Sequence, residues 1–452
     1  MAHPKTFQIL HISDLHINDS KEDRFDRSVV LDPLIERVKG DRSDVFRPEI
    51  VIVTGDIAFK GIKTEYDLAK DFFDDLLAAL DLNSDRLFVV PGNHDVNRKI
   101  YRPKDVPQYD NMQELNTELQ DQDYREDLLR GMADYFDFTE TYLPHFEHIQ
   151  GRLVPFVNTY TTECDKKIGL VGLNSAWMCR KSTDERTIAI GEYQVKTAME
   201  ELKDKGEVDL QIVLFHHPLD WLWPIDRKIC RTHLNNSILL SGHLHEVGGG
   251  YLSDLDGNLY RFQAGGAYLG TESSWPSRFH YITFDWGAHN IRLDFRKFVK
   301  ETRKWSIDGE TGDDGRKVFE MTGTIKEESH YRKAMPEIPE TYSGWILDHC
   351  TYMDIDHLQL DGKPIRVELP KIFIPLFAYG PDRESGDEDP QVRKETPLNV
   401  EELIGKHEYL LIEGDAGSGK TTVLKHLAYC LADGECQGIN MSGLEGRLPV
   451  LI

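Results

Sequence analysis

Short, continuous apolar runs rich in β-branched residues recur along the first half of the chain. They lie at residues 7–12, 50–53, 87–90, 168–173, 212–215 and 238–240. Runs of this kind predict strands that are covered on both faces. Between several of them lie stretches with helical periodicity, of which residues 66–80 are the clearest, because apolar side chains return there every three or four positions. Alternating strands and helices predict a layered α/β domain.

The pattern changes at two places within and after this domain. Residues 97–150 form an acidic, aromatic-rich insert that we expect to be helical, and it follows directly on the segment at 91–95. It is either a wall or lid over a site there or a pair of surface helices with no catalytic role. Further strand-like runs at 251–262 and 281–294 close the domain, which we expect to end near residue 325.

The remaining residues predict a connector and the start of a second domain. Residues 326–400 have mixed character, and within them the charged stretch 380–396 lacks apolar periodicity, which predicts an exposed loop or linker. Residues 401–452 begin with an apolar run at 409–412, which predicts a strand leading into a glycine-rich turn. The predicted organisation is therefore 1–325, 326–400 and 401–452, and 452 residues exceed the usual size of one hydrophobic core.

Composition and charge narrow the class of protein. The chain has no run of about 20 apolar residues and no signal-peptide core, so we expect a cytoplasmic protein with no membrane partner. Its six cysteines are far apart without Cys-x-x-Cys spacing, and we expect them to be reduced thiols. The formal charge of −25 argues against a surface that coats nucleic acid broadly.

Basic side chains nevertheless gather in three loops that follow predicted strands. They are Arg98, Lys99, Arg102 and Lys104, then Arg180 and Lys181, then Arg227, Lys228 and Arg231. Two interpretations stay open: these loops face a polyanionic substrate, or they are ordinary solvated loops.

Five short segments place metal-binding side chains directly after apolar runs. They are residues 11–16, 54–56, 91–95, 215–218 and 242–245. The carboxyl ends of strands in an open α/β sheet meet at one edge, so we expect these segments to converge. Together they offer carboxylates, imidazoles and one amide oxygen, a mixed nitrogen and oxygen set suited to Mn, Fe or Zn.

The spacing within the segments indicates two metal ions. Asp14 and His16 are two residues apart, so a turning backbone presents both to one cation. Asp56 follows a glycine and has two oxygens with which to bridge two cations about 3.5–4 Å apart. We assign His245 to the first metal. The second receives Asn93, His216 and His243. A lone histidine in a turn is usually structural, but five ordered segments favour a metal site.

His94 and Asp95 have a different predicted task. We expect His94 to protonate the departing alkoxide and Asp95 to hold the His94 ring in orientation. His217 either contacts phosphate or packs before Pro218. The tryptophans Trp177, Trp221 and Trp223 either stack on nucleobases beside the metals or pack in the core, which we favour.

The ordered elements Asp-x-His, Gly-Asp, Gly-Asn-His-Asp, His and Gly-His-x-His span roughly residues 6–290. With them the sequence resembles the calcineurin-like metallophosphoesterases, most closely their bacterial cyclic-nucleotide phosphodiesterase branch. The resemblance implies a four-layer α/β/β/α sandwich, two divalent metals with Mn²⁺ favoured, attack on phosphate by a metal-bound hydroxide, and the same division of the seven ligands between two metals. The insert at 97–150 departs from a minimal member of the family.

The glycine-rich turn after the run at 409–412 fits the phosphate-binding pattern G-x-x-x-x-G-K-T. Its predicted cofactor-binding residues are Gly414, Gly419, Lys420, Thr421 and Thr422. Backbone amides and Lys420 are expected to bind the phosphates of ATP, and Thr421 to bind Mg²⁺. The segment resembles the opening of NACHT-type signalling ATPases of the STAND class, which implies regulation, self-association and a role in bacterial immune signalling. No acidic metal-binding strand follows, so we expect a fragment that does not itself hydrolyse ATP.

The leading hypothesis is a metal-dependent phosphodiesterase effector that acts on a nucleic acid or a nucleotide and is regulated by the NACHT-like module. One alternative is a catalytically idle phosphoesterase fold that serves as a binding or assembly module for the ATPase. Another is a phosphatase that acts on phosphomonoesters or phosphoproteins.

Overall fold

The computed structural model divides the chain into two compact units, Met1–Leu252 with Asp256–Glu327, and Ser253–Leu255 with Glu328–Ile452. The structure describes residues 6–42, 46–102, 109, 111–180, 185–254, 257–270, 275–321, 345–347, 349–360, 363–368, 377–378, 398–399 and 420–433. All five ligand segments predicted from the sequence lie in the first unit.

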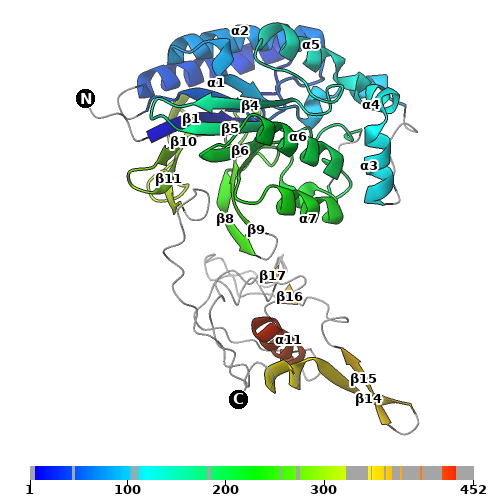
Figure 1. Ribbon diagram of the computed structural model, residues 1–452. Helices are drawn as coiled ribbons and strands as arrows, with labels where there is room; N and C mark the ends of the chain where they lie inside the picture. Colours follow the sequence, from blue (N-terminus) through cyan, green and yellow to red (C-terminus); the bar gives the residue numbers. More distant parts are fainter. Residues whose placement is uncertain are drawn as a thin grey trace, which may run out of the picture. The chain divides into compact units, whose positions relative to one another are not determined.

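A seven-stranded mixed sheet forms one half of the first unit (Figure 1). Its strands are β1 (Thr6–Ile12), β2 (Ile50–Val53), β3 (Leu87–Val89), β10 (Arg278–Asp285), β11 (Asn290–Val299), β12 (Lys304–Ile307) and β13 (Arg316–Glu320). The order is β12-β11-β10-β1-β2-β3, and β13 pairs with β11. Because β1, β2 and β3 are mutually parallel, their carboxyl ends lie at one edge.

A six-stranded sheet forms the other half. Its strands are β4 (Phe156–Thr161), β5 (Lys167–Gly172), β6 (Leu210–Leu214), β7 (Ile238–Ser241), β8 (Gly248–Asp254) and β9 (Gly257–Gln263). The order is β4-β5-β6-β7-β9-β8, with β5, β6, β7 and β9 parallel. The apolar runs of the sequence are confirmed as β1 to β3 and β5 to β7 in this mixed α/β fold.

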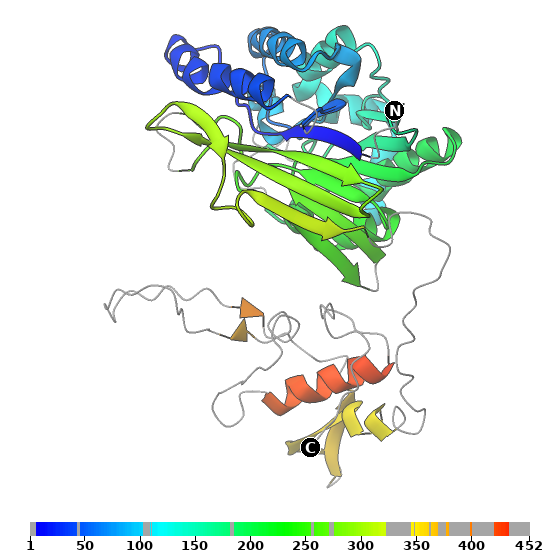
Figure 2. The ribbon, with the colours of Figure 1, turned by 90° about the vertical axis from the view of Figure 1, so that its left-hand side faces the viewer.

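Helices cover both sheets (Figures 1 and 2). They are α1 (Lys21–Asp41), α2 (Lys63–Leu80), α3 (Met112–Gln120), α4 (Gln122–Leu129), α5 (Ala133–Tyr142), α6 (Glu192–Asp204) and α7 (Pro224–His233). Helix α2, expected from the periodicity at 66–80, contacts α1 and α5, whereas α6 contacts α7, β4 and β5. Short 3-10 turns occur at Ser84–Arg86, Asn93–Asp95, Arg98–Ile100, Arg130–Met132 and Leu219–Trp221.

Aromatic side chains fill the space between the two sheets. Phe7 on β1 packs against Tyr160 on β4, with ring centroids 6.0 Å apart, and Phe88 on β3 packs against Phe156 at 5.6 Å. Trp177 is fully buried, in agreement with the core-packing interpretation for that residue. The two sheets therefore share one hydrophobic interior.

The insert is helical, as expected, and packs on α2. Tyr66 in the first turn of α2 stacks on Phe138 of α5, with ring centroids 5.3 Å apart and planes at 16°. Tyr135 of α5 meets the same Tyr66 ring edge-on. The insert is thus joined to the helix that follows β2.

The second unit holds a hairpin of β14 (Tyr352–Leu360) and β15 (Lys363–Glu368), a short pair of β16 (Phe377–Ala378) and β17 (Leu398–Asn399), and helix α11 (Lys420–Asp433). Helix α11 begins at Lys420, where the glycine-rich turn predicts a helix. The predicted strand at 409–412, the loop at 380–396 and both glycines of the motif, Gly414 and Gly419, lie outside the described residues.

Cysteine chemistry differs from the expectation at one position. Cys164, Cys179, Cys230 and Cys350 are thiols, whereas Cys430 is disulfide-bonded. The expectation of thiols throughout is wrong at Cys430, because missing Cys-x-x-Cys spacing does not exclude bonds at other separations.

Among the residues that the structure describes, no helix is both long enough and apolar enough to cross a bilayer.

Two glycines offer a matched test of core packing. Gly172 on β5 pairs with Phe156, and a Cβ atom at Gly172 would lie 2.5 Å from the Phe156 ring. Gly172→Ala should therefore lower the free energy of unfolding by about 1–3 kcal/mol through overpacking. Gly40→Ala, in α1 with open space around it, should change stability by less than about 1 kcal/mol. Urea unfolding of both variants measures this, and equal midpoints would contradict the tight contact between β5 and the Phe156 ring.

Candidate metal centre

The loops that follow β1, β2, β3, β6 and β7 meet at the carboxyl ends of these strands. The Asp14 amide donates to the Gly55 carbonyl at 3.1 Å, which joins the first two loops. The Gly242 amide donates to the His216 carbonyl at 3.0 Å, which joins the last two. A bridge between Ser13 and Gly266 connects the loop after β1 with the segment after β9. The predicted convergence of the five segments is confirmed.

One group of side chains gathers around Asp14. Its Oδ1 lies 3.4 Å from His245 Nε2 and 3.9 Å from His16 Nε2, and His16 Nδ1 lies 3.9 Å from Asp56 Oδ2. Both Asp14 Oδ1 and His16 Nδ1 are buried without a hydrogen-bond partner. Buried polar atoms are normally paired, so these two atoms indicate room for a cation among Asp14, His16, Asp56 and His245.

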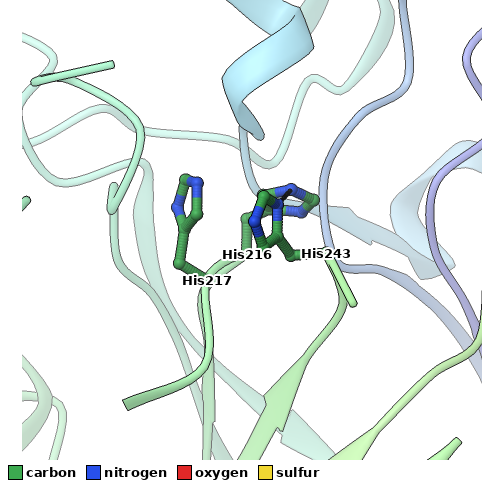
Figure 3. Close-up of side chains that lie close together, drawn as sticks. All are labelled: His216, His217 and His243. Atoms are coloured by element: carbon green, nitrogen blue, oxygen red, sulfur yellow. Dashed lines mark hydrogen bonds between the residues drawn. The ribbon is translucent and has the colours of Figure 1, made fainter. Parts of the chain in front are cut away.

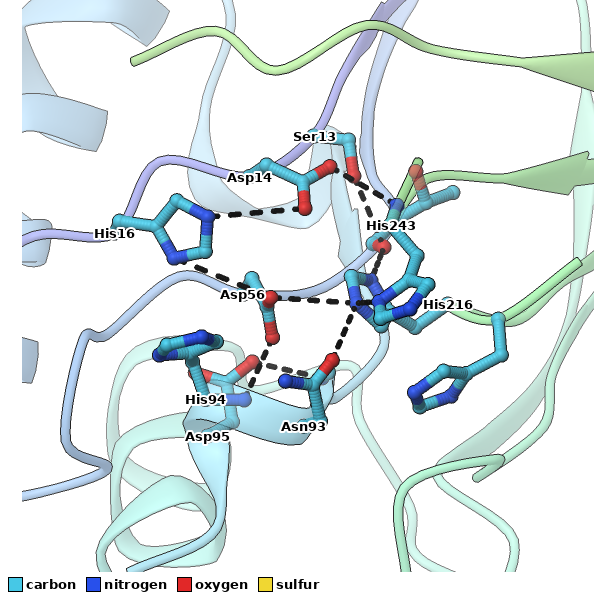
Figure 4. A network of polar contacts seen from close by, with 12 residues as sticks. Ser13, Asp14, His16, Asp56, Asn93, His94, Asp95, His216 and His243 are labelled. Carbon is cyan, nitrogen blue, oxygen red and sulfur yellow. Dashed lines mark hydrogen bonds and ion pairs between the residues drawn. The ribbon is translucent and has the colours of Figure 1, made fainter. Parts of the chain in front are cut away.

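A second group gathers around His216 (Figure 4). Its Nε2 lies 3.3 Å from Asp56 Oδ2, 3.2 Å from Asn93 Oδ1 and 3.2 Å from His243 Nδ1. Two imidazole nitrogens and two oxygens thus point toward one small volume, which fits a divalent transition metal. Asp56 belongs to both groups. All seven ligands predicted from the sequence are therefore brought together.

Five of the seven candidate ligands have a left-handed backbone. They are Asp14 (φ 54°), His16 (φ 44°), Asp56 (φ 53°), His243 (φ 73°) and His245 (φ 58°). This conformation is uncommon for residues other than glycine and costs free energy, which packing and hydrogen bonds must offset. Its concentration here shows that the local backbone is bent to aim these side chains inward.

The carboxylates of Asp14 and Asp56 are each fixed through one oxygen. The His243 amide donates to Asp14 Oδ2 at 3.1 Å, and the His94 amide donates to Asp56 Oδ1 at 2.7 Å. Only the other oxygen of each, Asp14 Oδ1 and Asp56 Oδ2, faces the candidate ligand groups. Backbone amides therefore orient both carboxylates before any cation binds.

A second layer of hydrogen bonds orients His216. Its Nδ1 donates to the Thr54 carbonyl at 2.7 Å, so Nε2 points at the other ligands. The Ser13 hydroxyl also donates to the Thr54 carbonyl, and Thr54 Oγ1 lies 3.0 Å from Nε2 of the buried His11. Partners of this kind fix the tautomer and ring direction of metal-binding histidines.

The electrostatics of the centre favour positive charge. Burial opposes ionisation of Asp14, yet its close contact with His245 and the nearby His216 lower the pKa of Asp14 to about 2. Burial likewise opposes protonation of His216, but the Asp56 carboxylate raises the pKa of His216 to about 9. Buried carboxylates that draw a proton onto a neighbouring imidazole provide the field that also attracts a metal cation.

The structure shows a different partner for His94 from the one expected. The Asp95 carboxylate accepts hydrogen bonds from the amides of Gly92, Ile57 and Ala58 and from the Tyr66 hydroxyl. The His94 ring is held instead by the Phe59 carbonyl, which accepts from Nδ1 at 2.8 Å. The expectation that Asp95 orients His94 is therefore not met, because its carboxylate is turned into the interior and stabilises the loops after β2 and β3.

His217 lies beside His216 and His243 (Figure 3). Its Nδ1 lies 2.9 Å from Ser175 Oγ and its Nε2 lies 3.7 Å from Cys179 Sγ. Burial, and then the neighbouring His243, lower the pKa of His217 well below its usual value. These contacts favour the packing interpretation for this residue.

Two aromatic residues border the candidate ligands. Trp221 is half-buried and meets the His243 ring edge-on at 4.1 Å. Phe59 is 42% exposed and lies 5.3 Å from the His94 ring and 6.3 Å from the His16 ring. The sequence analysis identifies Trp221 as a candidate but misses Phe59. The one signal for Phe59 in the sequence is its place four residues after Gly55.

Residues 7–247 match the family model described as calcineurin-like phosphoesterase, which is more than half of the chain. The chain belongs to the calcineurin-like phosphoesterase family. The phosphoesterases of this family use divalent metals and act on phosphoesters, in agreement with the clusters of candidate metal-binding side chains.

The chain is also similar to a curated protein named uncharacterized metallophosphoesterase-like protein YydB, from Bacillus subtilis (strain 168). The identity is 24% over 320 residues, which covers 68% of this chain and 62% of that protein. The chain thus spans less than two thirds of the length of this relative.

Among solved structures, Vps29 from Chaetomium thermophilum is similar with 12% identity and a TM-score of 0.28, covering 73% of this chain and 99% of Vps29. A predicted phosphoesterase from Streptococcus pneumoniae TIGR4 is similar with 11% identity and a TM-score of 0.26, covering 70% and 98%. Similarity at this level supports no argument about function.

Metal binding can be tested residue by residue. Because Asp56 belongs to both candidate ligand groups, Asp56→Asn should weaken Mn²⁺ binding at both, whereas His245→Ala should weaken it at only one. Equilibrium dialysis with elemental analysis measures the bound metal per chain. The exposed Glu185 provides a control, and Glu185→Gln should bind metal as the unmodified protein does. Equal losses in Asp56→Asn and His245→Ala would contradict the shared position of Asp56.

Proposed function

We propose that the protein is a dinuclear-metal-dependent phosphodiesterase that acts on nucleotides or nucleic acid. The observation that carries the proposal is the position of the buried Asp56, which contributes Oδ2 to two adjacent groups of candidate ligands. Two cations held side by side stabilise both the attacking and the leaving oxygen of a phosphoryl transfer. Asp14, His16, Asp56 and His245 would hold one cation, and Asp56, Asn93, His216 and His243 the other. The nitrogen and oxygen donor set favours Mn²⁺, with Fe or Zn as alternatives.

His94 is the residue best placed to protonate the leaving group. The Phe59 carbonyl accepts from Nδ1, which leaves Nε2 as the nitrogen available to a substrate. The ring lies 4.6 Å from that of the candidate ligand His16, so a phosphate bound at the first group would be close to it. A positioned acid of this kind contributes about 10²–10⁴-fold to such reactions.

The surroundings of the ligands favour a diester with bulky substituents over a phosphomonoester. Phe59 borders the first ligand group and Trp221 borders the second, so aromatic surface is present beside both. Arg98 lies nearby and donates to the Asn93 carbonyl at 3.3 Å. Nucleobases stack on aromatic side chains, and arginine attracts the remaining phosphates of a polyanion.

The proposed activity is tested with purified protein and Mn²⁺. We expect hydrolysis of bis-p-nitrophenyl phosphate and of at least one of single-stranded DNA, RNA or a cyclic nucleotide, with a lower kcat/KM for p-nitrophenyl phosphate. His94→Ala should lose about 10²-fold or more in kcat on a nucleotide diester, because the departing alkoxide then lacks its proton donor. The monoester as preferred substrate would instead indicate a phosphatase. No turnover of any substrate by metal-loaded protein would leave only the binding-module alternative.

Trp221 should contribute to binding of nucleobases. Trp221→Ala is expected to raise KM for a dinucleotide by about 5- to 100-fold, which corresponds to roughly 1–3 kcal/mol of stacking, with little change in kcat. The control is Trp286→Ala: Trp286 follows Asp285, whose partner Thr6 lies at the opposite end of β1 from Asp14. Steady-state kinetics distinguish the two, and an unchanged KM in Trp221→Ala would contradict the stacking role.

For the second unit we propose nucleotide binding at the start of α11, in a NACHT-like module that regulates the phosphodiesterase and takes part in immune signalling. The support is the sequence motif together with the helix that begins at Lys420. Lys420, Thr421 and Thr422 would contact the phosphates and Mg²⁺.

A further inference from the structure

Glu65 is a buried carboxylate that the proposed chemistry does not use. It lies in the first turn of α2 and is fully buried. Burial is the main cause that raises the pKa of Glu65 above its usual value. An acidic residue at this place in a helix commonly reaches back to the amide of its own N-terminal cap. Glu65 reaches further, to the loop after β2, and burying its charge there costs free energy that only specific contacts offset.

The contacts of Glu65 are concentrated on one oxygen. Oε2 accepts from the Lys60 amide at 2.7 Å and from the Phe59 amide at 3.2 Å. Oε1 accepts no hydrogen bond, and the Lys60 ammonium lies 3.6 Å from it. One carboxylate oxygen therefore fixes two successive backbone amides.

The peptide group between Phe59 and Lys60 joins Glu65 to His94. Its N–H, from Lys60, donates to Glu65 Oε2, and its C=O, from Phe59, accepts from His94 Nδ1 at 2.8 Å. A peptide group is planar and rigid, so fixing one end fixes the direction of the other. Hydrogen bonds in series also polarise one another, which makes the Phe59 carbonyl a stronger acceptor.

We propose that Glu65 is a positioning residue for the acid of the phosphodiesterase, acting on His94 through the Phe59–Lys60 peptide group. The inference rests on the proposed function, because it assumes that His94 donates a proton to the leaving group. Glu65 does this without touching substrate or metal. In a catalytic triad a carboxylate orients the histidine through a direct hydrogen bond. Here the Phe59–Lys60 peptide group stands between the carboxylate and the imidazole and transmits the orientation.

Two substrates with different leaving groups distinguish a positioning role of Glu65 from a purely structural one. p-Nitrophenolate departs without a proton, whereas the alkoxide of a dinucleotide needs one. Misorienting His94 should therefore slow hydrolysis of the dinucleotide thymidylyl-thymidine and spare bis-p-nitrophenyl phosphate. Damage to the fold or to the metal ligands would slow both.

The test compares kcat and KM on these two diesters with Mn²⁺ in four variants. In Glu65→Ala we expect kcat to fall by about 10-fold or more on the dinucleotide and by less than about threefold on the p-nitrophenyl diester, with KM unchanged. Glu65→Gln keeps an oxygen for the two amides and places its nitrogen where Oε1 makes no hydrogen bond. It should restore most of the dinucleotide activity, and a selective loss of that activity in Glu65→Gln would contradict the proposed role of the Oε2 contacts.

Asp226→Asn is the matched control. Asp226 is also a buried carboxylate that accepts from two successive amides, those of Ile190 and Gly191, and none of its contacts reaches the candidate ligands. It should lower the thermal midpoint without changing the ratio of the two activities.

The variant His94→Ala distinguishes a failure of the role proposed for Glu65 from a failure of the acid role proposed for His94. If it slows the dinucleotide selectively and Glu65→Ala slows both diesters equally or neither, the role of Glu65 is refuted and the proposed function stands. If His94→Ala slows both diesters equally, the acid role of His94 fails and the inference fails with it. Selective loss in both variants, with rescue by Glu65→Gln, supports the proposal.

Discussion

The centre depends on two buried carboxylates, Asp14 and Asp56, that are each fixed through one oxygen and left with the other facing the candidate ligands. A buried carboxylate is costly unless it is hydrogen-bonded and balanced by positive charge. Backbone amides satisfy the first condition, and imidazoles or cations satisfy the second. The left-handed backbone at both residues is the conformational cost of this arrangement.

Close approach of the loops is the second constraint, and glycine makes it possible. A Cβ atom at Gly92 would lie 2.1 Å from Asp56 Oδ1, and one at Gly242 would lie 1.9 Å from the Ser13 hydroxyl. Both glycines precede candidate ligands, so the same residues that start the turns leave room for the neighbouring loop. The parallel register of β1 to β3 and of β5 to β7 then brings the loops to one edge.

The sequence predicts well which polar side chains come together, because their segments follow the ends of buried strands, and strand ends are marked by a change from apolar to polar residues. It predicts the central strands for the same reason but gives no signal for β13, most of whose side chains are exposed. It also misassigns the partner of His94, since a backbone carbonyl such as that of Phe59 accepts a hydrogen bond whatever its side chain. The direction of the Asp95 carboxylate depends on loops far apart in sequence, which local patterns do not encode.

The stacking of Tyr66 on Phe138 links the insert, through α2, to the candidate metal centre. Tyr66 bonds Asp95, which secures the loops after β2 and β3, and the adjacent Glu65 bonds the loop that holds His94. A binding partner or a deletion that displaces α5 would therefore affect both His94, the proposed acid, and the loops that carry the candidate ligands Asp56 and Asn93. A molecule that binds the surface of the insert could therefore inhibit the proposed activity without competing with the substrate.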